Sequence, residues 1–349
     1  MTSTTPRPVL LIGGSGIVGS KTATLLRRFH PTLPIVISGR DRTRAETVAT
    51  RIGNARAVAV DIAHPELGIE GDAAFGAVAV FVKDDTLNAL RFAQARGVPY
   101  IGISSGLIEL VPEVTAFIHR PGSAPIVLAS HCLAGAAVLT ALDLSREFGQ
   151  VDDVRIGLVL DEQDAGGPAA IQDFERLVAV SSAGLIQKDG RFCWLLGDAA
   201  ATSLTSVDGT ELAAQGVAVP DVTSLALALD ATSVHLEMAV GVTSTRRRGE
   251  AFSVEVIVEL KGKGRDDRPL VRTGTLVHPD GMRSLTGLAV IVALERLLGL
   301  DGNGPVGPGL YMPETIIDPG HFVRRAVEIG ARLHRFDTAW AEVTKTQKR

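Results

Sequence analysis

The first 130 residues alternate short apolar runs with longer stretches of helical periodicity. Apolar runs that are not broken by polar positions are typical of parallel strands buried on both faces. These runs lie at residues 9–12, 35–38, 58–60, 78–82, 100–103 and 126–129. Because helical segments separate the runs, the pattern predicts a doubly wound parallel sheet of the α/β class.

The pattern changes after about residue 150. Residues 234–242 and 252–260 place an apolar side chain at every second position. Such alternation is typical of a strand with one polar face, so we expect an antiparallel hairpin whose tip is the polar link 243–250. Residues 154–160 and 270–277 are also strand-like. These segments predict a second domain with its own sheet.

Composition and charge restrict the class of partner. The chain of 349 residues is 21% charged and has a net charge of −4, which gives no basic surface for nucleic acid or an anionic membrane. No apolar run reaches the roughly 18 residues of a membrane-spanning helix. Two cysteines cannot build a disulfide framework or a cysteine-rich metal site. We therefore expect a cytoplasmic protein without a metal that acts on a small molecule.

A glycine motif follows the first apolar run directly and precedes a helix. Residues 14–19 match the pattern G-x-G-x-x-G, in which the glycines permit a tight turn, close approach of the pyrophosphate and close helix packing. The N-terminus of the helix then offers free N–H groups to the phosphates. The motif predicts a dinucleotide site formed by Gly14, Ser15, Gly16, Ile17 and Val18.

The end of the second strand bears on the choice of cofactor. NAD-binding chains usually carry an acid there, about 20 residues past the loop, whereas this chain reads Ser38-Gly39-Arg40. Arg40 can make charge-assisted bonds to a 2′-phosphate, and Ser38 can add a hydroxyl. Two alternatives to this role remain. Arg40 can be a solvated residue at the start of a helix, or Asp41 can contact a ribose. We expect NADP(H).

Further cofactor contacts are expected where the next strands end. Asp61 can accept a hydrogen bond from the adenine amino group or serve only as a cap, and Ile62 follows it. Val82 and Lys83 end the fourth strand, where Lys83 can meet a phosphate or a substrate carboxylate or lie in solvent. Ser104 closes the fifth strand and can reach the nicotinamide ribose.

The inventory of acid–base groups is sparse. His131 follows the sixth strand at the carboxyl edge of the sheet, so it is the candidate proton donor, with a packed histidine as the alternative. Neither Tyr100 nor Tyr311 starts a Tyr-x-x-x-Lys motif. A substrate that is already a protonated imine fits this sparse inventory. Arg191 or the arginines at 246–248 can hold a substrate carboxylate, although the triplet also fits a solvated hairpin tip.

Four stretches together resemble the saccharopine dehydrogenase-like family, in its NADP-type reductase branch. They are residues 9–19, 38–40, 97–101 and 308–314. The resemblance implies an N-terminal Rossmann domain completed by C-terminal helices and an inserted α+β mixed-sheet domain. It also implies that the inserted domain carries substrate contacts and a homodimer interface. Where many relatives read Gly-x-x-Pro-Gly, residues 130–135 read Ser-His-Cys-Leu-Ala-Gly, which argues against saccharopine as the substrate.

Motif and resemblance together predict an NADPH-dependent oxidoreductase that reduces a C=N bond by hydride transfer. Residues 1–131 and 284–349 are expected to form the dinucleotide-binding Rossmann domain, and residues 132–283 the substrate-binding and dimerisation domain. A ketone or enoyl reductase that uses NADPH is the alternative among enzymes. A non-catalytic NADP(H)-binding sensor or scaffold is the alternative outside them.

Overall fold

The computed structural model describes residues 6–69, 74–164, 167, 171–173, 175–176 and 183–347. The chain divides into two compact units. The first comprises Met1–Ser130 and Thr286–Ile316, and the second comprises His131–Leu285 and Ile317–Arg349. The sequence predicts that the last residues belong to the dinucleotide domain. They cluster instead with the second unit, because the strand β16 (Arg332–Phe336) pairs with β14 (Pro269–His278) of that unit.

The first unit is built around one parallel sheet. Its described strands are β1 (Val9–Ile12), β2 (Ile35–Gly39), β3 (Ala55–Ala59), β4 (Ala77–Val80), β5 (Tyr100–Gly102), β6 (Pro125–Leu128) and β15 (Gly309–Tyr311). They lie in the order β15-β6-β5-β4-β1-β2-β3, so the predicted parallel sheet is confirmed, with β15 as an addition. Its helices are α1 (Ile17–Phe29), α2 (Arg42–Ile52), α3 (Asn88–Arg96), α4 (Leu110–His119), α10 (Pro313–Ile316) and the larger part of α9 (Met282–Leu298).

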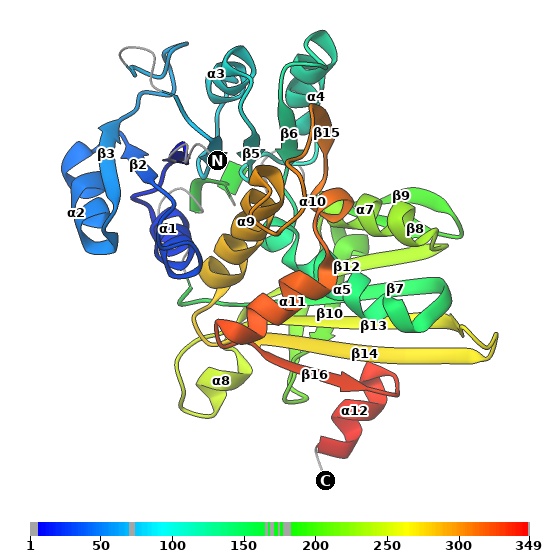
Figure 1. Ribbon diagram of the computed structural model, residues 1–349. Coiled ribbons are helices and arrows are strands. Elements are labelled where there is room, and N and C mark those ends of the chain that lie inside the picture. The colour runs from blue at the N-terminus through cyan, green and yellow to red at the C-terminus, as the bar shows by residue number, and fades with distance from the viewer. Residues whose placement is uncertain are drawn as a thin grey trace. The chain divides into compact units, whose positions relative to one another are not determined.

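Helices cover both faces of this sheet. Figure 1 shows α3 and α4 on one face, and α1, α2 and α9 on the other. The central strands β1 and β4 are therefore buried along their whole length, as their apolar composition predicts. The chain runs from β1 toward β3 on one side and from β4 toward β6 on the other. The carboxyl ends of β1 and β4 thus flank the point at which doubly wound sheets bind ligands.

The second unit contains a mixed sheet. Its described strands are β7 (Phe148–Asp161), β8 (Gly184–Lys188), β9 (Arg191–Leu195), β10 (Ala201–Thr205), β11 (Glu211–Gly216), β12 (Ser233–Gly241), β13 (Val254–Gly264), β14 and β16. Their main order is β10-β11-β12-β7-β13-β14-β16, and β8 pairs with β12 and β9. Its helices include η1 (Cys132–Gly135), α5 (Ala136–Leu144), η2 (Ser145–Glu147), η3 (Gly197–Ala200), α7 (Pro220–Leu229), α8 (Ser244–Arg247), α11 (Pro319–Glu328) and α12 (Trp340–Gln347).

The hairpin predicted between residues 234–242 and 252–260 is wrong. β7 lies between the two strands and pairs in parallel with β12 and antiparallel with β13. The link 243–250 is therefore no hairpin tip, and it contains the short helix α8. Alternation along a strand determines which face is apolar, but it does not determine which strand lies beside it.

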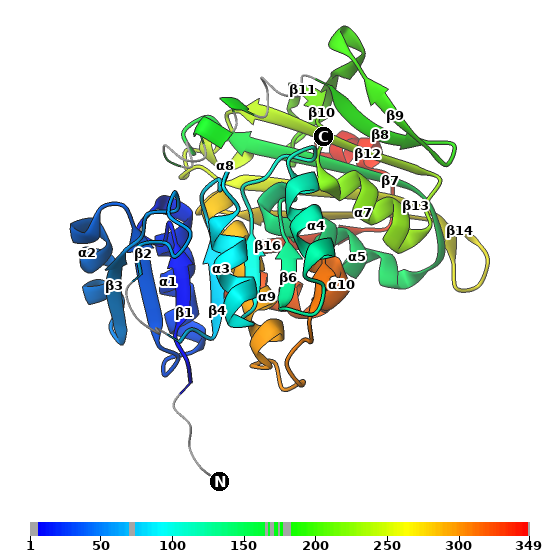
Figure 2. The same ribbon diagram turned by 90° about the horizontal axis from the view of Figure 1, so that it is seen from above.

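The two faces of this sheet carry different elements. Figures 1 and 2 show α5 and α7 on one face, with α11 beside α5, and α12 on the opposite face. The face that carries α5 and α7 holds the apolar core, with buried side chains such as Val154, Ile156, Leu236 and Val258. The face that carries α12 combines the acid Glu259, which accepts from the Trp340 N–H, with an apolar cluster of Ile257, Trp340 and Val343.

Candidate functional site

The turn after β1 is shaped by glycines that no larger residue can replace without strain. Gly13 has a φ of +80°, and its N–H donates to the Ser38 carbonyl at 3.0 Å. A Cβ atom at Gly19 would lie 2.4 Å from the Gly13 oxygen and 2.7 Å from Cα of Gly14. The helix α1 therefore packs directly on the turn, which is the role that the motif predicts for its last glycine.

The N-terminus of α1 opens at this turn. Gly16 is the N-cap residue, and Ser15, Ile17 and Val18 are partly exposed beside it. The N–H groups in the first turn of a helix have no intrahelical acceptor, and the helix dipole favours an anion there. A Cβ atom at Gly39 would lie 2.9 Å from Ser15 Oγ, so the end of β2 also approaches the turn closely. The cradle fits a dinucleotide pyrophosphate.

The side chains at the end of β2 separate into buried and exposed groups. Ser38 is fully buried, and its Oγ donates to the carbonyl of Leu11 at 3.0 Å. Asp41 caps α2 by accepting from the Arg44 N–H at 3.0 Å. Arg40 is exposed and, within the described part of the chain, makes no ion pair or hydrogen bond through its side chain. Its guanidinium is thus open to a phosphate.

The residues after β3 form a turn. Asp61 is exposed, and its Oδ1 accepts from the Ala63 N–H at 3.0 Å, which fits the cap that the sequence left as an alternative. The carbonyl of Ile62 accepts from Thr86 Oγ1 and from Asn88 Nδ2, both at 3.0 Å. These bonds join the turn after β3 to the loop after β4 on the same unit.

The loop after β4 brings two predicted contact residues to the carboxyl edge of the sheet. Val82 packs on the glycine turn, since its Cγ1 lies 3.0 Å from a Cβ atom built at Gly13. The Lys83 side chain is largely buried rather than solvated. Its Nζ lies 3.8 Å from Glu109 Oε2 and 3.9 Å from Asp85 Oδ1. Lys83 therefore pairs with two acids near the carboxyl ends of β1 and β4, where doubly wound sheets bind ligands.

A buried carboxyl that the sequence analysis missed lies beside this cluster. Glu113 on α4 is buried, and its Oε1 accepts from Ser105 Oγ at 3.0 Å. Its Oε2 has no hydrogen-bond partner among the described residues. Burial raises the pKa of Glu113 to about 7, against the opposing effects of the Ser105 hydroxyl and Lys83. Ser104, the predicted ribose contact, precedes this pair and is partly exposed.

The helical pattern contained a signal for Glu113. Leu110, Glu113, Val114 and Phe117 occupy the i, i+3, i+4 and i+7 positions of one helix face. Leu110 is buried, and Val114 and Phe117 pack against the same core. An acid on the core face of an otherwise apolar stripe marks a buried carboxyl, which is rare unless it is paired or functional.

His131 is the first residue of the second unit, and its surroundings keep it neutral. Its Nε2 lies 2.8 Å from Ser224 Oγ, and burial lowers the pKa of His131 to about 3. The Cys132 N–H donates to Asp221 Oδ2 at 2.8 Å. Leu133 then adopts a left-handed φ of +53°, which is strained for a residue with a side chain. The residues that follow β6 thus form a tight turn.

The arginine triplet is not a solvated tip. Arg246 Nη1 lies 2.7 Å from Asp161 Oδ1, and Arg247 Nε lies 2.6 Å from Asp208 Oδ2. Burial would raise the pKa of Asp161, but hydrogen bonds from Thr243, Gln163 and Arg246 bring it below the usual value. Arg248 remains half exposed. Arg191, the other candidate for a substrate carboxylate, lies exposed on β9.

Among the residues that the structure describes, no group of three or more His, Cys, Asp and Glu side chains is placed as metal ligands. No described helix has the length and apolar character needed to cross a bilayer.

The fold resembles that of solved oxidoreductases. Apo saccharopine dehydrogenase (L-Glu forming) from Saccharomyces cerevisiae superposes with a TM-score of 0.65 at 14% identity, covering 95% of this chain and 100% of that one. Scyllo-inositol dehydrogenase from Lactobacillus casei aligns with a TM-score of 0.48 at 12% identity, over 94% and 95% of the two chains. No protein-family model and no curated protein matches the sequence. The resemblance drawn from the motifs is thus confirmed for the fold.

Proposed function

We propose that the chain is an NADPH-dependent oxidoreductase that reduces a C=N bond in a small molecule. The observation that carries the proposal is the glycine cradle with the open N-terminus of α1, together with Arg40 at the end of β2, whose side chain has no partner among the described residues. Likeness of fold to yeast saccharopine dehydrogenase supports the reaction class. The family resemblance further supports a homodimer.

The residues of the first unit would bind and orient the cofactor. The N–H groups at the start of α1 would hold the pyrophosphate, and Arg40 would pair with a 2′-phosphate through charge-assisted hydrogen bonds. Lys83 would neutralise a further phosphate or a substrate carboxylate at the edge of β4. Bound NADPH supplies the hydride. The protein's own contribution is to position the ring and to exclude water.

A C=N substrate suits the acid–base groups that the chain offers. A protonated imine already carries the positive charge that hydride transfer neutralises, so it needs no proton from the protein. His131 stays the predicted proton donor for a neutral imine. Because burial lowers its pKa to about 3, the imidazole is neutral near pH 7 and would have to take up a proton first. This makes a substrate that arrives protonated the simpler choice.

One observation favours the alternative of a ketone reductase. A ketone needs a proton as well as a hydride, and Glu113 with its pKa of about 7 would hold one near neutrality. Ser105 Oγ, which bonds to this carboxyl at 3.0 Å, would be the hydroxyl through which the proton moves. This route requires Glu113 for turnover, whereas reduction of a protonated imine does not.

The deciding experiment is NADPH oxidation with cyclic imines, with ketone–amine pairs and with the same ketones alone, using NADH as the control. We expect turnover that requires the imine or the added amine and that prefers NADPH. Turnover of ketones without amine, lost in Glu113→Gln, would replace the proposal with the ketone reductase. Tight NADPH binding without turnover of any compound would support the sensor instead.

A further inference from the structure

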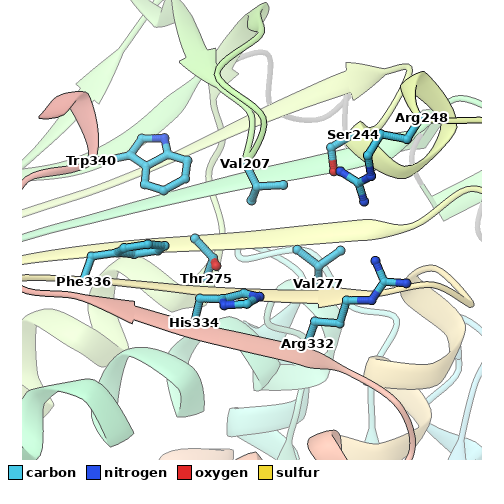
Figure 3. A pocket seen from close by; sticks show the side chains of 9 residues that line it. All are labelled: Val207, Ser244, Arg248, Thr275, Val277, Arg332, His334, Phe336 and Trp340. Carbon is cyan, nitrogen blue, oxygen red and sulfur yellow. The ribbon is translucent and has the colours of Figure 1, made fainter. Parts of the chain in front are cut away.

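A pocket of about 270 Å³ lies within the second unit, on the face of its sheet that carries α12. β14 and β16 form its floor, because their register pairs Thr275 with His334 and Val277 with Arg332 on one face. Ser244 at the start of α8 and Trp340 at the start of α12 line it from the other side (Figure 3). The link 243–250, which the sequence analysis took for a hairpin tip, thus forms part of a pocket wall.

The two ends of the pocket differ in chemistry. Arg248 and Arg332 extend their guanidinium groups toward each other at one end, as Figure 3 shows. Phe336 and Trp340 lie at the other end with ring centroids 6.2 Å apart, and His334 stacks on Phe336 at 6.4 Å. One end therefore offers positive charge and hydrogen-bond donors, and the other offers apolar ring surface.

The two arginines retain unused donors. Arg248 Nε and Arg332 Nη2 each lie 3.2 Å from an oxygen of Glu250, which bridges them. Among the described residues these are the only hydrogen bonds of the two guanidinium groups. Each guanidinium carries five N–H donors, so most of them are available to a ligand. One carboxylate also balances only one of the two positive charges.

Charged side chains that neighbour the lining residues already have partners within the protein. Glu255 accepts from the N–H groups of Ser244 at 2.7 Å and Val207 at 3.0 Å. Arg247 pairs with Asp208 at 2.6 Å. Since these neighbouring groups are paired within the protein, Arg248 and Arg332 set the sign of the charge that a ligand meets.

Ser244 provides an independent sign that a ligand is missing. The residue is fully buried, it lines the pocket, and its Oγ has no hydrogen-bond partner within the described residues. A buried hydroxyl without a partner is destabilising and calls for an explanation. A ligand oxygen near α8 would accept from this hydroxyl. The hydroxyl and the guanidinium groups all donate, which selects an acceptor with negative charge.

We infer that this pocket binds a small carboxylate that carries an aromatic or branched apolar group. The carboxylate lies between Arg248 and Arg332 within reach of Ser244, and the apolar group lies against Phe336 and Trp340. The size fits, because a cavity of about 150 Å³ already holds benzene, which leaves room here for a carboxylate. This inference rests on the contacts of the second unit and not on the proposed oxidoreductase function.

The first test is calorimetric titration of the full-length protein with phenylacetate, 3-phenylpropanoate and 4-methylpentanoate. At least one of these acids is expected to bind, with phenylacetamide and acetate at least about tenfold weaker than phenylacetate, because each lacks one half of the recognised structure. Absence of binding by all three acids, or equal binding of phenylacetate and phenylacetamide, would overturn the inference.

The second test locates the site. Arg332→Gln is expected to weaken binding of the acid by about tenfold, and Ser244→Ala by a few-fold. Arg268→Gln is the matched control, because it removes the same charge from a side chain that is 85% exposed. If Arg332→Gln and Ser244→Ala bind the acid as tightly as the control does, the acid binds elsewhere and the inference is overturned. Sedimentation of the same samples completes the test. If the protein binds no acid but self-associates, and Arg332→Gln abolishes this self-association, the pocket binds a second copy of the chain. That outcome also overturns the inference.

Discussion

The candidate sites in the two units differ in which atoms supply the hydrogen-bond donors. In the first unit most donors are backbone N–H groups at the turn after β1 and at the start of α1. In the second unit the donors are the side chains of Ser244, Arg248 and Arg332. A site of backbone atoms is inseparable from the fold around it, whereas a side chain can be exchanged with the fold intact. The same small substitution should therefore have very different consequences in the two units.

The largest effect is expected for Gly19→Ala. The added Cβ atom would lie 2.4 Å from the carbonyl oxygen of Gly13, so α1 or the turn must move, at a cost of at least about 2 kcal/mol. NADPH binding should fall by more than about a hundredfold, since the displaced atoms are those that hold the phosphates. Thermal unfolding and cofactor titration measure the two effects separately.

Gly122→Ala is the matched control for this prediction. The same substitution in the same unit meets no atom within 4 Å, so its stability and NADPH affinity should remain close to those of the parent. If Gly19→Ala bound NADPH as tightly as Gly122→Ala, the backbone cradle would not be the cofactor site.

The next effect concerns stability as a function of pH and the buried Glu113. Its folded pKa of about 7 lies above the ordinary value of 4.5, so the folded state holds the proton more tightly than the unfolded chain. This contribution to stability is complete below about pH 4.5 and is lost as the pH rises to about 7. The loss amounts to as much as about 3 kcal/mol, since one pKa unit corresponds to about 1.4 kcal/mol.

Glu113→Gln should abolish this dependence, because the amide resembles the protonated carboxyl and does not ionise. Denaturant unfolding at pH 5 and pH 8 should show the parent losing more stability than the variant over that interval. The exposed Glu46→Gln should leave the slope as in the parent. Equal slopes for the parent and Glu113→Gln would mean that Glu113 ionises as readily in the folded chain as in the unfolded one.

A smaller and more selective effect is expected for Arg40→Gln. It removes a side chain rather than a backbone donor, so the cradle stays intact and only the 2′-phosphate contact is lost. NADPH affinity should fall by roughly tenfold to a hundredfold, the range for a charge-assisted hydrogen bond. NADH affinity should stay within about twofold. Arg51→Gln, at the far end of α2, controls for the loss of positive charge, and equal losses for both cofactors would contradict the assignment.

The difference between the units also explains what could be predicted from the sequence. The six parallel strands and the glycine turn were predictable because local patterns encode them: apolar runs, strand-to-helix spacing and glycines with defined roles. β15 was missed as a strand, since three partly buried residues, Gly309–Tyr311, carry no apolar run. The burial of Glu113 was predictable from the apolar face of its helix and was missed, whereas its hydrogen bond with Ser105, eight positions earlier, depends on the tertiary fold.

The strand pairing of the second unit was harder to predict from the sequence, for a physical reason. β7 lies between β12 and β13 although it precedes both by many residues, and alternation carries no information about such non-local pairing. Without that pairing the arginines at 246–248 were placed at a hairpin tip, while the structure pairs Arg246 with the buried Asp161 and Arg247 with the partly exposed Asp208. The pocket was invisible for the same reason, because Ser244 and Arg332 are 88 positions apart in the chain.

The smallest effect gives the sharpest comparison of two side chains within the second unit. Ser206 and Ser244 are both fully buried, but of their two hydroxyls only that of Ser206 has hydrogen-bond partners among the described residues. Ser206 Oγ donates to Glu255 at 2.6 Å and accepts from Arg247 at 2.5 Å. Ser206→Ala should cost about 1–3 kcal/mol, since it removes a donor from a buried carboxylate. Ser244→Ala should change the free energy of unfolding by less than about 0.5 kcal/mol, or raise it slightly, because no bond is lost.

Denaturant unfolding of both variants without added ligand measures the difference. Equal destabilisation would show that the Ser244 hydroxyl already contributes to the fold, and this result would contradict its role in binding a ligand.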